Sequence, residues 1–202
     1  MGYTAIIDYH VGNLASIRNA LDYIGAESRV TAEEAELERA DGIILPGVGA
    51  FPDAWEALNQ RGLPEVLRRQ AKKKPMLGIC LGMQLLLDSS SEVRPCRGLG
   101  FVPGTVDRIP TALKLPHIGW NALHFTTPSP LFHGIDEGAY VYFVHSFCAA
   151  AARPETVYAV TDYGTEVTAA IGSGNVYGTQ FHPEKSGDVG LEILKNFVGL
   201  QQ

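Results

Sequence analysis

The chain contains 202 residues, which suffices for one domain with a substantial hydrophobic core. Its formal net charge is −6, so the composition predicts no basic surface for nucleic acid or for an anionic membrane. The longest apolar runs, such as Met76–Leu81, are far too short to span a bilayer.

The chain has three cysteines, Cys80, Cys96 and Cys148. Their odd number and the absence of any CxxC spacing argue against a disulfide framework and against a zinc site. Neither a GxGxxG dinucleotide motif nor a complete P-loop is present. We therefore expect no cofactor and no metal, and the reducing cytoplasm as the compartment.

Up to about Ser89, the chain alternates apolar strand-like segments with segments of helical periodicity, an order typical of a mainly parallel sheet. The predicted strands are Tyr3–Asp8, Ser28–Thr31, Gly42–Leu45 and Met76–Cys80. Helices are predicted from Leu14 to Ile24, from Pro64 towards Lys74, and from Leu81 to about Asp88. The acidic segment Ala32–Ala40 separates two strands and is assigned no element.

Beyond Ser89, β-type segments dominate, and a closing helix is predicted from about Val189 to Val198. The predicted strands are Tyr140–Cys148, Thr156–Asp162, Val167–Ile171 and Val176–Phe181, with a hairpin turn at Gly172–Asn175. The fold class is therefore α/β: a mainly parallel, doubly wound sheet with flanking helices plus additional antiparallel β segments. We expect a single domain over residues 1–202.

Cys80 lies in Gly78-Ile79-Cys80-Leu81-Gly82-Met83-Gln84, where a predicted strand runs directly into a predicted helix. Such a turn holds a nucleophile at its apex, and the flanking glycines let neighbouring backbone approach. The start of a helix also stabilises negative charge and offers free N–H groups to an oxyanion. The alternative is that Cys80 is a small buried hydrophobic residue at a strand end.

A second motif, Gln180-Phe181-His182-Pro183-Glu184, follows another predicted strand. Pro183 favours extended backbone at His182, where residues i and i+2 point to the same side. Glu184 can then orient His182 while the other imidazole nitrogen faces Cys80, as in a nucleophile–base–carboxylate triad. A plain polar loop is the alternative, but both motifs end strands, where open α/β sheets place their sites.

Five other histidines compete with His182. His145 is the main competitor because it also follows a strand, but no acidic residue lies near it in sequence, so we assign it a structural or substrate-side role. The others show no metal-ligand spacing and are expected to be solvated or satisfied locally: His10, His117, His124 and His133.

A third segment, Leu45-Pro46-Gly47-Val48-Gly49-Ala50, also ends a strand. Two glycines within three residues permit unusual backbone angles, so its N–H groups can turn towards a bound carbonyl. By itself, Pro-Gly is equally an everyday turn.

Together, these three segments resemble the class I, or triad-type, glutamine amidotransferases, whose pattern is a GxCxGxQ elbow, a His-Pro-Glu and a Pro-Gly-rich oxyanion strand. The resemblance spans essentially the whole chain. It implies that Cys80 attacks the side-chain amide of glutamine, and that His182, supported by Glu184, relays the proton. Ammonia leaves, and water hydrolyses the thioester.

The resemblance also assigns binding roles. The backbone N–H groups of Leu81 and, after a rearrangement, Gly49 would form the oxyanion hole. The implied substrate-binding residues are Gly47, Gln84, Ser146 and Phe147.

Within the family, the chain looks like the glutaminase subunits of imidazole glycerol phosphate synthase, which act in histidine biosynthesis. Three further segments carry this match: Asp8–Leu14, Pro116–Asn121 and His182–Ser186. The resemblance implies a heterodimer with a (β/α)8-barrel cyclase subunit that receives the ammonia. The implied interface residues are Asn13, Trp120, Tyr142 and Lys185.

The chain departs from its family at two positions, because glycine is usual where His10 stands and tyrosine is frequent where Phe147 stands. Rival interpretations are a catalytically silent regulatory subunit, the glutaminase of another class I enzyme such as pyridoxal phosphate synthase, and a free-standing γ-glutamyl hydrolase. The intact Cys-His-Glu set argues against the first, Trp120 and Asn121 against the second, and Gln84 against the third.

Overall fold

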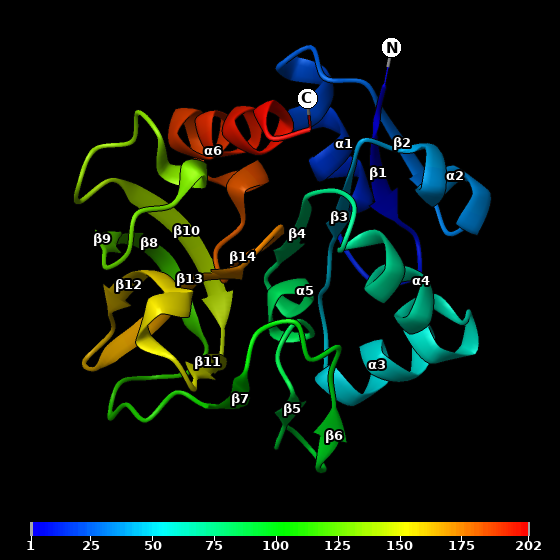
Figure 1. Ribbon diagram of the computed structural model, residues 1–202. Coiled ribbons are helices and arrows are strands. Elements are labelled where there is room, and N and C mark those ends of the chain that lie inside the picture. The colour runs from blue at the N-terminus through cyan, green and yellow to red at the C-terminus, as the bar shows by residue number, and fades with distance from the viewer. Residues whose placement is uncertain (1, 202) are drawn as a thin grey trace.

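A mixed sheet of eight strands runs through the computed structural model, which describes residues 2–201 (Figure 1). Its strand order is β2-β1-β3-β4-β14-β13-β12-β9, in which the first five pair in parallel and the last three are antiparallel. The predicted fold class is therefore confirmed. The strands are β1 (Thr4–Ile7), β2 (Ser28–Thr31), β3 (Gly42–Leu45), β4 (Met76–Ile79), β9 (His124–Phe125), β12 (Val157–Asp162), β13 (Glu166–Ser173) and β14 (Val176–Thr179).

Helices cover both faces of the parallel strands, as a doubly wound sheet requires (Figure 1). On the face of α1 and α6, Ile6 shares a core cluster with Ile17 and Phe197. On the face of α2, α3 and α4, its neighbour Ile7 shares another cluster with Leu58. The helices are α1 (Leu14–Tyr23), α2 (Glu34–Arg39), α3 (Phe51–Gln60), α4 (Leu63–Gln70), α5 (Leu81–Gln84) and α6 (Gly187–Gly199).

Two smaller sheets accompany the main one. In the first, β8 (His117–Ala122) pairs with β10 (Tyr140–His145). The second has the order β11-β7-β5-β6 and contains β5 (Ser89–Ser90), β6 (Cys96–Arg97), β7 (Gly104–Arg108) and β11 (Phe147–Ala151). Short 3-10 helices are η1 (Pro130–Phe132), η2 (Pro154–Thr156) and η3 (Pro183–Lys185). Across residues 2–201, no helix is long and apolar enough to cross a membrane.

The prediction of one strand over Tyr140–Cys148 is wrong, because the chain changes sheets at Ser146. His145 still pairs with β8, whereas Phe147 already pairs with Arg108 on β7. The run contains no glycine or proline that would reveal the break. The change of sheets turns residues 145–147 towards the cavity described below.

The helix predicted from Leu81 to about Asp88 stops at Gln84. Continuation would require the N–H of Asp88 to bond to the carbonyl of Gln84, but it donates to Gly104 instead, at 3.1 Å. The carbonyls of Leu85 and Leu86 accept from residues 99, 101 and 102. Long-range backbone pairing therefore overrides the local helical pattern.

Two helices, α2 and α3, were not predicted. In α2 only Leu37 is buried, so no apolar periodicity marks it. Its end is stabilised by the Lys74 ammonium group, which donates to the carbonyls of Leu37 and Glu38 at 2.9 Å each. The first N–H of α3, at Phe51, is capped by Glu92 at 2.8 Å. Both stabilising contacts come from residues that are distant in sequence from the helix they stabilise.

Candidate active site

Cys80 occupies the turn between β4 and α5. Its φ of 55° and ψ of −112° are unusual for a residue with a side chain, which marks a strained position. Its N–H donates to the carbonyl of Thr179 on β14 at 2.7 Å, which holds the turn against the sheet. The side chain is buried, so the strain positions a sulfur atom beside the carboxyl ends of the central strands.

Glycines allow three backbone segments to meet at this turn. A Cβ at Gly78 would lie 2.6 Å from the carbonyl oxygen of Gly82, and one at Gly82 would lie 1.9 Å from that of Leu45. A Cβ at Gly47 would lie 2.7 Å from the amide nitrogen of Gly82. These contacts are the close approach expected around the cysteine. Gly47 therefore packs against α5, and it is not among the residues that line the cavity.

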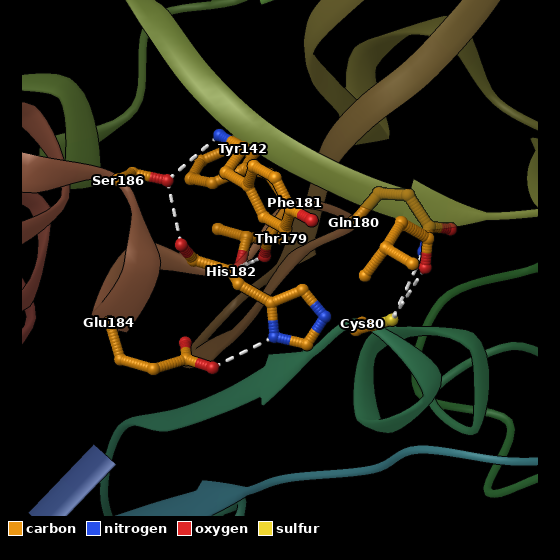
Figure 2. Close-up of polar contacts among 9 residues, drawn as sticks. Cys80, Tyr142, Thr179, Gln180, Phe181, His182, Glu184 and Ser186 are labelled. Carbon is orange, nitrogen blue, oxygen red and sulfur yellow. Dashed lines mark hydrogen bonds and ion pairs between the residues drawn. The ribbon is translucent and has the colours of Figure 1, made fainter. Parts of the chain in front are cut away.

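His182 and Glu184 lie beside Cys80, after the end of β14 (Figure 2). Nδ1 of His182 lies 2.8 Å from Oε1 of Glu184, and the two side chains are only 3% and 1% exposed. The backbone N–H of His182 donates to the carbonyl of Tyr142 on β10 at 3.0 Å. Figure 2 shows the second ring nitrogen on the Cys80 side, and this Nε2 has no hydrogen-bond partner among the described residues.

The pKa of His182 reflects its two neighbours. Burial by itself lowers the pKa, but the interactions with Cys80 and Glu184 outweigh burial and raise it to about 9. At neutral pH the ring therefore holds a proton that it can deliver to a leaving group. Sulfur, imidazole and carboxylate stand in the order of a catalytic triad.

A cavity of about 320 Å³ opens over the sulfur. It brings together residues from all three predicted segments and from the change of sheets at Ser146. The lining residues are Val48, Gly49, Cys80, Leu81, Gln84, Glu92, Pro116, Val144, His145, Ser146, Phe147 and His182. Within residues 2–201, no group of three or more His, Cys, Asp and Glu side chains is placed to hold a metal ion.

Comparison with known proteins places this arrangement in a family. The family model described as glutamine amidotransferase class-I matches residues 5–200. The chain belongs to the class I glutamine amidotransferases. Two similar relatives are named imidazole glycerol phosphate synthase subunit HisH, one from Bacillus thuringiensis (strain Al Hakam) and one from Bacillus cereus (strain G9842). They are 49% and 51% identical over 197 residues, which cover 97% of this chain and 94% of each relative.

Solved structures support the same fold. The structure of PurLQS from Thermotoga maritima superposes with a TM-score of 0.80 at 19% identity, covering 100% of this chain and 99% of that chain. A crystal structure described as glutamine amidotransferase superposes with a TM-score of 0.78 at 18% identity, covering 99% of both chains. At these identities the likeness concerns the fold alone.

The predicted oxyanion donors of this class I amidotransferase line the cavity beside Cys80. The N–H of Leu81 belongs to the first residue of α5 and so has no partner within the helix. Within the described chain, the N–H groups of Val48 and Gly49 donate to no other backbone group, and Gly49 has a φ of 96°. In both predicted donor segments, these N–H groups thus form no backbone hydrogen bond within the described chain.

The geometry assigns His145 a role different from that of the triad histidine. Its Nδ1 donates to the carbonyl of Phe147 at 2.8 Å, and its Nε2 lies 3.1 Å from Nδ1 of His117. Burial is the main cause that lowers the pKa of His145 to about 4, so the ring is neutral at pH 7. These contacts favour His182 as the base and His145 as a structural residue.

His117 differs from the expectation of a solvated or locally satisfied histidine. It is 2% exposed, and its ring stacks on Phe143 and Tyr163 with centroid distances of 4.9 and 4.0 Å. Its hydrogen-bonded neighbour is 28 residues away in sequence. By contrast His10, His124 and His133 are exposed, as expected.

The predicted interface residues surround one edge of the site. Trp120 on β8 and Tyr142 on β10 are cross-strand partners with ring centroids 6.1 Å apart. We call the outer side of this two-stranded sheet the β8–β10 apolar face. Lys185 is exposed on η3, and Asn13 is the half-buried residue before α1. The face consists of Ile118, Trp120, Tyr140, Tyr142 and Val144.

Glu92 is the functional candidate that sequence reasoning missed. It is the one carboxylate among the residues that line the cavity, and its Oε2 accepts from the N–H of Phe51 at 2.8 Å. No motif marks it, because it lies in the irregular segment between β5 and β6. Only the three-dimensional path of that segment brings a negative charge to the site.

Proposed function

We propose that this chain is the glutaminase subunit of an imidazole glycerol phosphate synthase of histidine biosynthesis, acting in the cytoplasm. One observation carries the chemistry: Cys80 and His182 line a single cavity, and Glu184 pairs with His182. The two HisH relatives, about half identical over nearly the whole chain, support the choice of enzyme.

The reaction begins from the ion pair in which His182 holds the proton of the Cys80 thiol, and the thiolate Sγ bonds to the side-chain amide carbon of glutamine. The carbonyl oxygen becomes an oxyanion that accepts from the N–H groups of Leu81 and Gly49. Nε2 of His182 then protonates the amide nitrogen, the C–N bond breaks and ammonia leaves. Water, deprotonated by His182, attacks the thioester, and the C–S bond breaks to release glutamate.

The amino-acid end of glutamine carries an ammonium and a carboxylate, and the cavity offers complementary groups. Glu92 supplies the negative charge that an ammonium requires. Gln84 donates both protons of Nε2 to protein groups, which leaves its carbonyl oxygen to accept from the substrate. The backbone of Ser146 and Phe147 forms the adjoining wall. Gly47 does not line the cavity, so it would affect substrate binding indirectly, by fixing the position of the Val48–Gly49 backbone.

The partner in this proposal is a (β/α)8-barrel cyclase subunit that docks on the β8–β10 apolar face. Trp120 and Tyr140 are 51% and 60% exposed, an unusual display of large apolar side chains on one small sheet. The carbonyl of Tyr142 accepts from the N–H of His182, so the face is continuous with the triad. Lys185 and Asn13 extend the surface, and Lys185 offers a charge to an acidic partner group.

We further propose that the subunit is nearly idle alone. The peptide between Val48 and Gly49 is able to rotate, because Gly49 has open space around its Cα and takes a positive φ. A missing oxyanion donor costs about 3 kcal/mol, on the order of a hundredfold in rate. Docking of the cyclase, with its nucleotide substrate bound, would favour the productive rotation.

The test measures glutamate formation by the isolated chain, by the chain with the cyclase subunit, and by both with the nucleotide ligand. We expect a rise of about a hundredfold across the series. Equal rates in all three would contradict the rotation, and full activity of the chain alone would favour a γ-glutamyl hydrolase. A pull-down that recovers a different synthase would favour another class I glutaminase.

A further inference from the structure

We propose that Gln180 is a further catalytic residue, whose side-chain amide donates a hydrogen bond to the sulfur of Cys80 and stabilises the thiolate. This inference rests on the proposed function, in which that thiolate attacks glutamine. Gln180 lies in the same motif as His182, but neither the triad nor the substrate contacts assign it a role.

Gln180 contacts the reacting atom itself. Its Nε2 lies 3.7 Å from Sγ of Cys80, a normal separation for an N–H···S bond (Figure 2). The residue is fully buried and follows β14 directly, so its side chain has little freedom to turn away. The sulfur also lies 4.0 Å from the carbonyl of Val144, an acceptor for the thiol proton only. Of the two polar groups, only the Gln180 amide favours the charged sulfur.

The direction of the Gln180 amide follows from its neighbours. The carbonyl of Phe147 can only accept, so the atom of Gln84 that lies 3.0 Å from it must be the NH2 group. The same NH2 group lies 3.0 Å from Gln180, which must therefore present its oxygen there. The remaining end of the Gln180 amide, the NH2 group, then faces Cys80.

The chain of hydrogen bonds continues to the β8–β10 sheet. Because the Phe147 carbonyl only accepts, His145 must carry its proton on Nδ1, and its Nε2 accepts from Nδ1 of His117. Both rings are buried, and burial lowers the pKa of each, so both are neutral at pH 7. Every donor and acceptor between His117 and the sulfur thus has one consistent orientation, and none of them carries a charge.

The bond would act twice in the cycle. A hydrogen bond to a charged group is stronger than one to a neutral group, so the Gln180 bond gains strength when the thiol loses its proton. It gains strength again when the C–S bond of the thioester breaks and the sulfur leaves as an anion. His182 regains a proton from the attacking water before the C–S bond breaks, so the Gln180 bond adds to the effect of His182 on the sulfur.

The experiment measures the rate at which iodoacetamide alkylates Cys80 between pH 5 and pH 9, followed by intact mass. It uses the full chain with Cys96→Ala and Cys148→Ala, so that one thiol remains. Gln180→Met keeps the side-chain length and removes the donor. We expect alkylation at pH 7 to fall about tenfold, and the pH profile to move to higher pH.

Two further variants make the result decisive. Gln70→Met is the matched control, because Gln70 is also buried but lies on α4 with no contact to the site, and it should alkylate like the parent. Gln180→Glu retains an acceptor for Gln84 and presents a carboxyl oxygen to the sulfur, so alkylation at pH 8 should fall at least as far. If Gln180→Met does not fold, Gln180→Glu decides.

Alkylation within twofold of the parent for the folded Gln180 variants would overturn the inference. Because this readout needs no glutamine, it separates the two ideas. A parent that alkylates as expected but does not hydrolyse glutamine even with the cyclase subunit and its nucleotide ligand would contradict the proposed function and leave the Gln180–Cys80 bond intact.

Discussion

The two sides of Cys80 are built in opposite ways. On one side, His182 pairs with the carboxylate of Glu184 and faces the sulfur. On the other side, Gln180, Gln84 and His145 form a chain of neutral hydrogen bonds. In the proposed mechanism, one side moves protons, and the other holds the sulfur and the substrate wall in place.

A comparison of His182 and His145 shows what decides whether a buried histidine carries a proton. Both are less than a tenth exposed, and burial acts on each to lower its pKa. His182 lies beside a carboxylate and a sulfur, and its pKa is raised to about 9. His145 has no carboxylate beside it, so burial lowers its pKa to about 4, although its bond to the Phe147 carbonyl acts in the opposite direction. The partners, and not the depth of burial, separate a proton carrier from a structural ring.

The largest expected effect is the loss of the nucleophile between the two sides. Cys80→Ala should abolish glutamine hydrolysis, by on the order of 10⁴-fold or more, because no covalent pathway remains. Circular dichroism should report an intact fold. The matched variants Cys96→Ala and Cys148→Ala should stay active, since neither sulfur lines the cavity. Near-normal turnover by Cys80→Ala would contradict the proposed mechanism.

Replacing each of the two histidines with asparagine, one at a time, tests the comparison directly. His182→Asn should reduce turnover almost as far as Cys80→Ala, because members of a triad act as one unit. His145→Asn should cost about tenfold at most, since it disturbs only the placement of the Phe147 carbonyl. Steady-state kinetics with saturating cyclase subunit measures both. The opposite ranking would mean that the base has been misassigned.

A smaller effect is expected from the orienting carboxylate. Glu184→Gln keeps the size of the side chain but loses the charge that stabilises the protonated ring. We expect turnover to fall by about a hundredfold, less than for His182→Asn. A pH–rate profile should also show the limb governed by His182 moving to lower pH. An unchanged profile would argue against the Glu184 contact.

The sequence predicted the proton-moving side better than the neutral side. Cys80, His182 and Glu184 lie in short motifs whose geometry follows from a strand end and a proline. The neutral side is assembled from four separate segments, so no local spacing reveals it. The role of His117 depends on the pairing of β8 with β10, and that of Gln180 on the fold of β14 against β4.

The same division holds for the fold. The parallel strands β1, β3 and β4 are buried apolar runs of four residues, and their predicted positions are nearly those observed. The errors lie where distant backbone decides, at the end of α5 and at the change of sheets at Ser146. The capped helices α2 and α3 depend on Lys74 and Glu92, which no local pattern connects to them.

In the proposed complex, docking of the partner would reach both sides of Cys80 through β10 and should be sensitive to one aromatic side chain. Trp120→Ala should weaken binding of the cyclase subunit by about thirtyfold, as expected for a large apolar residue near the centre of an interface. Isothermal titration calorimetry measures the change. Tyr23→Ala is the control, because Tyr23 is 80% exposed on α1 and lies outside the β8–β10 apolar face. Equal affinities for the two variants would remove Trp120 from the interface.

The smallest effect concerns the pH dependence of stability, where the two histidines should act in opposite directions. His182 has a folded-state pKa of about 9, above its ordinary value of 6.5. Its stabilising contribution is therefore complete below pH 6.5 and is lost as the pH rises through 9. His145 has a folded-state pKa of about 4, below 6.5. The unfolded chain binds its proton more readily, so stability is lost as the pH falls from 6.5 through 4.

Urea denaturation between pH 4 and pH 9 should detect each contribution as a change on the order of 1–2 kcal/mol in the free energy of unfolding. His145→Asn should flatten the acid side of the profile and leave the alkaline side unchanged. His182→Asn should do the reverse, and each variant thus serves as the control for the other. If both variants flattened the same side, the two histidines would not be held in opposite charge states, and the contrast between the two sides of Cys80 would fail. If the free energy of unfolding of the unmodified chain stayed constant from pH 6.5 to 9, that result would contradict the raised pKa of His182 in particular.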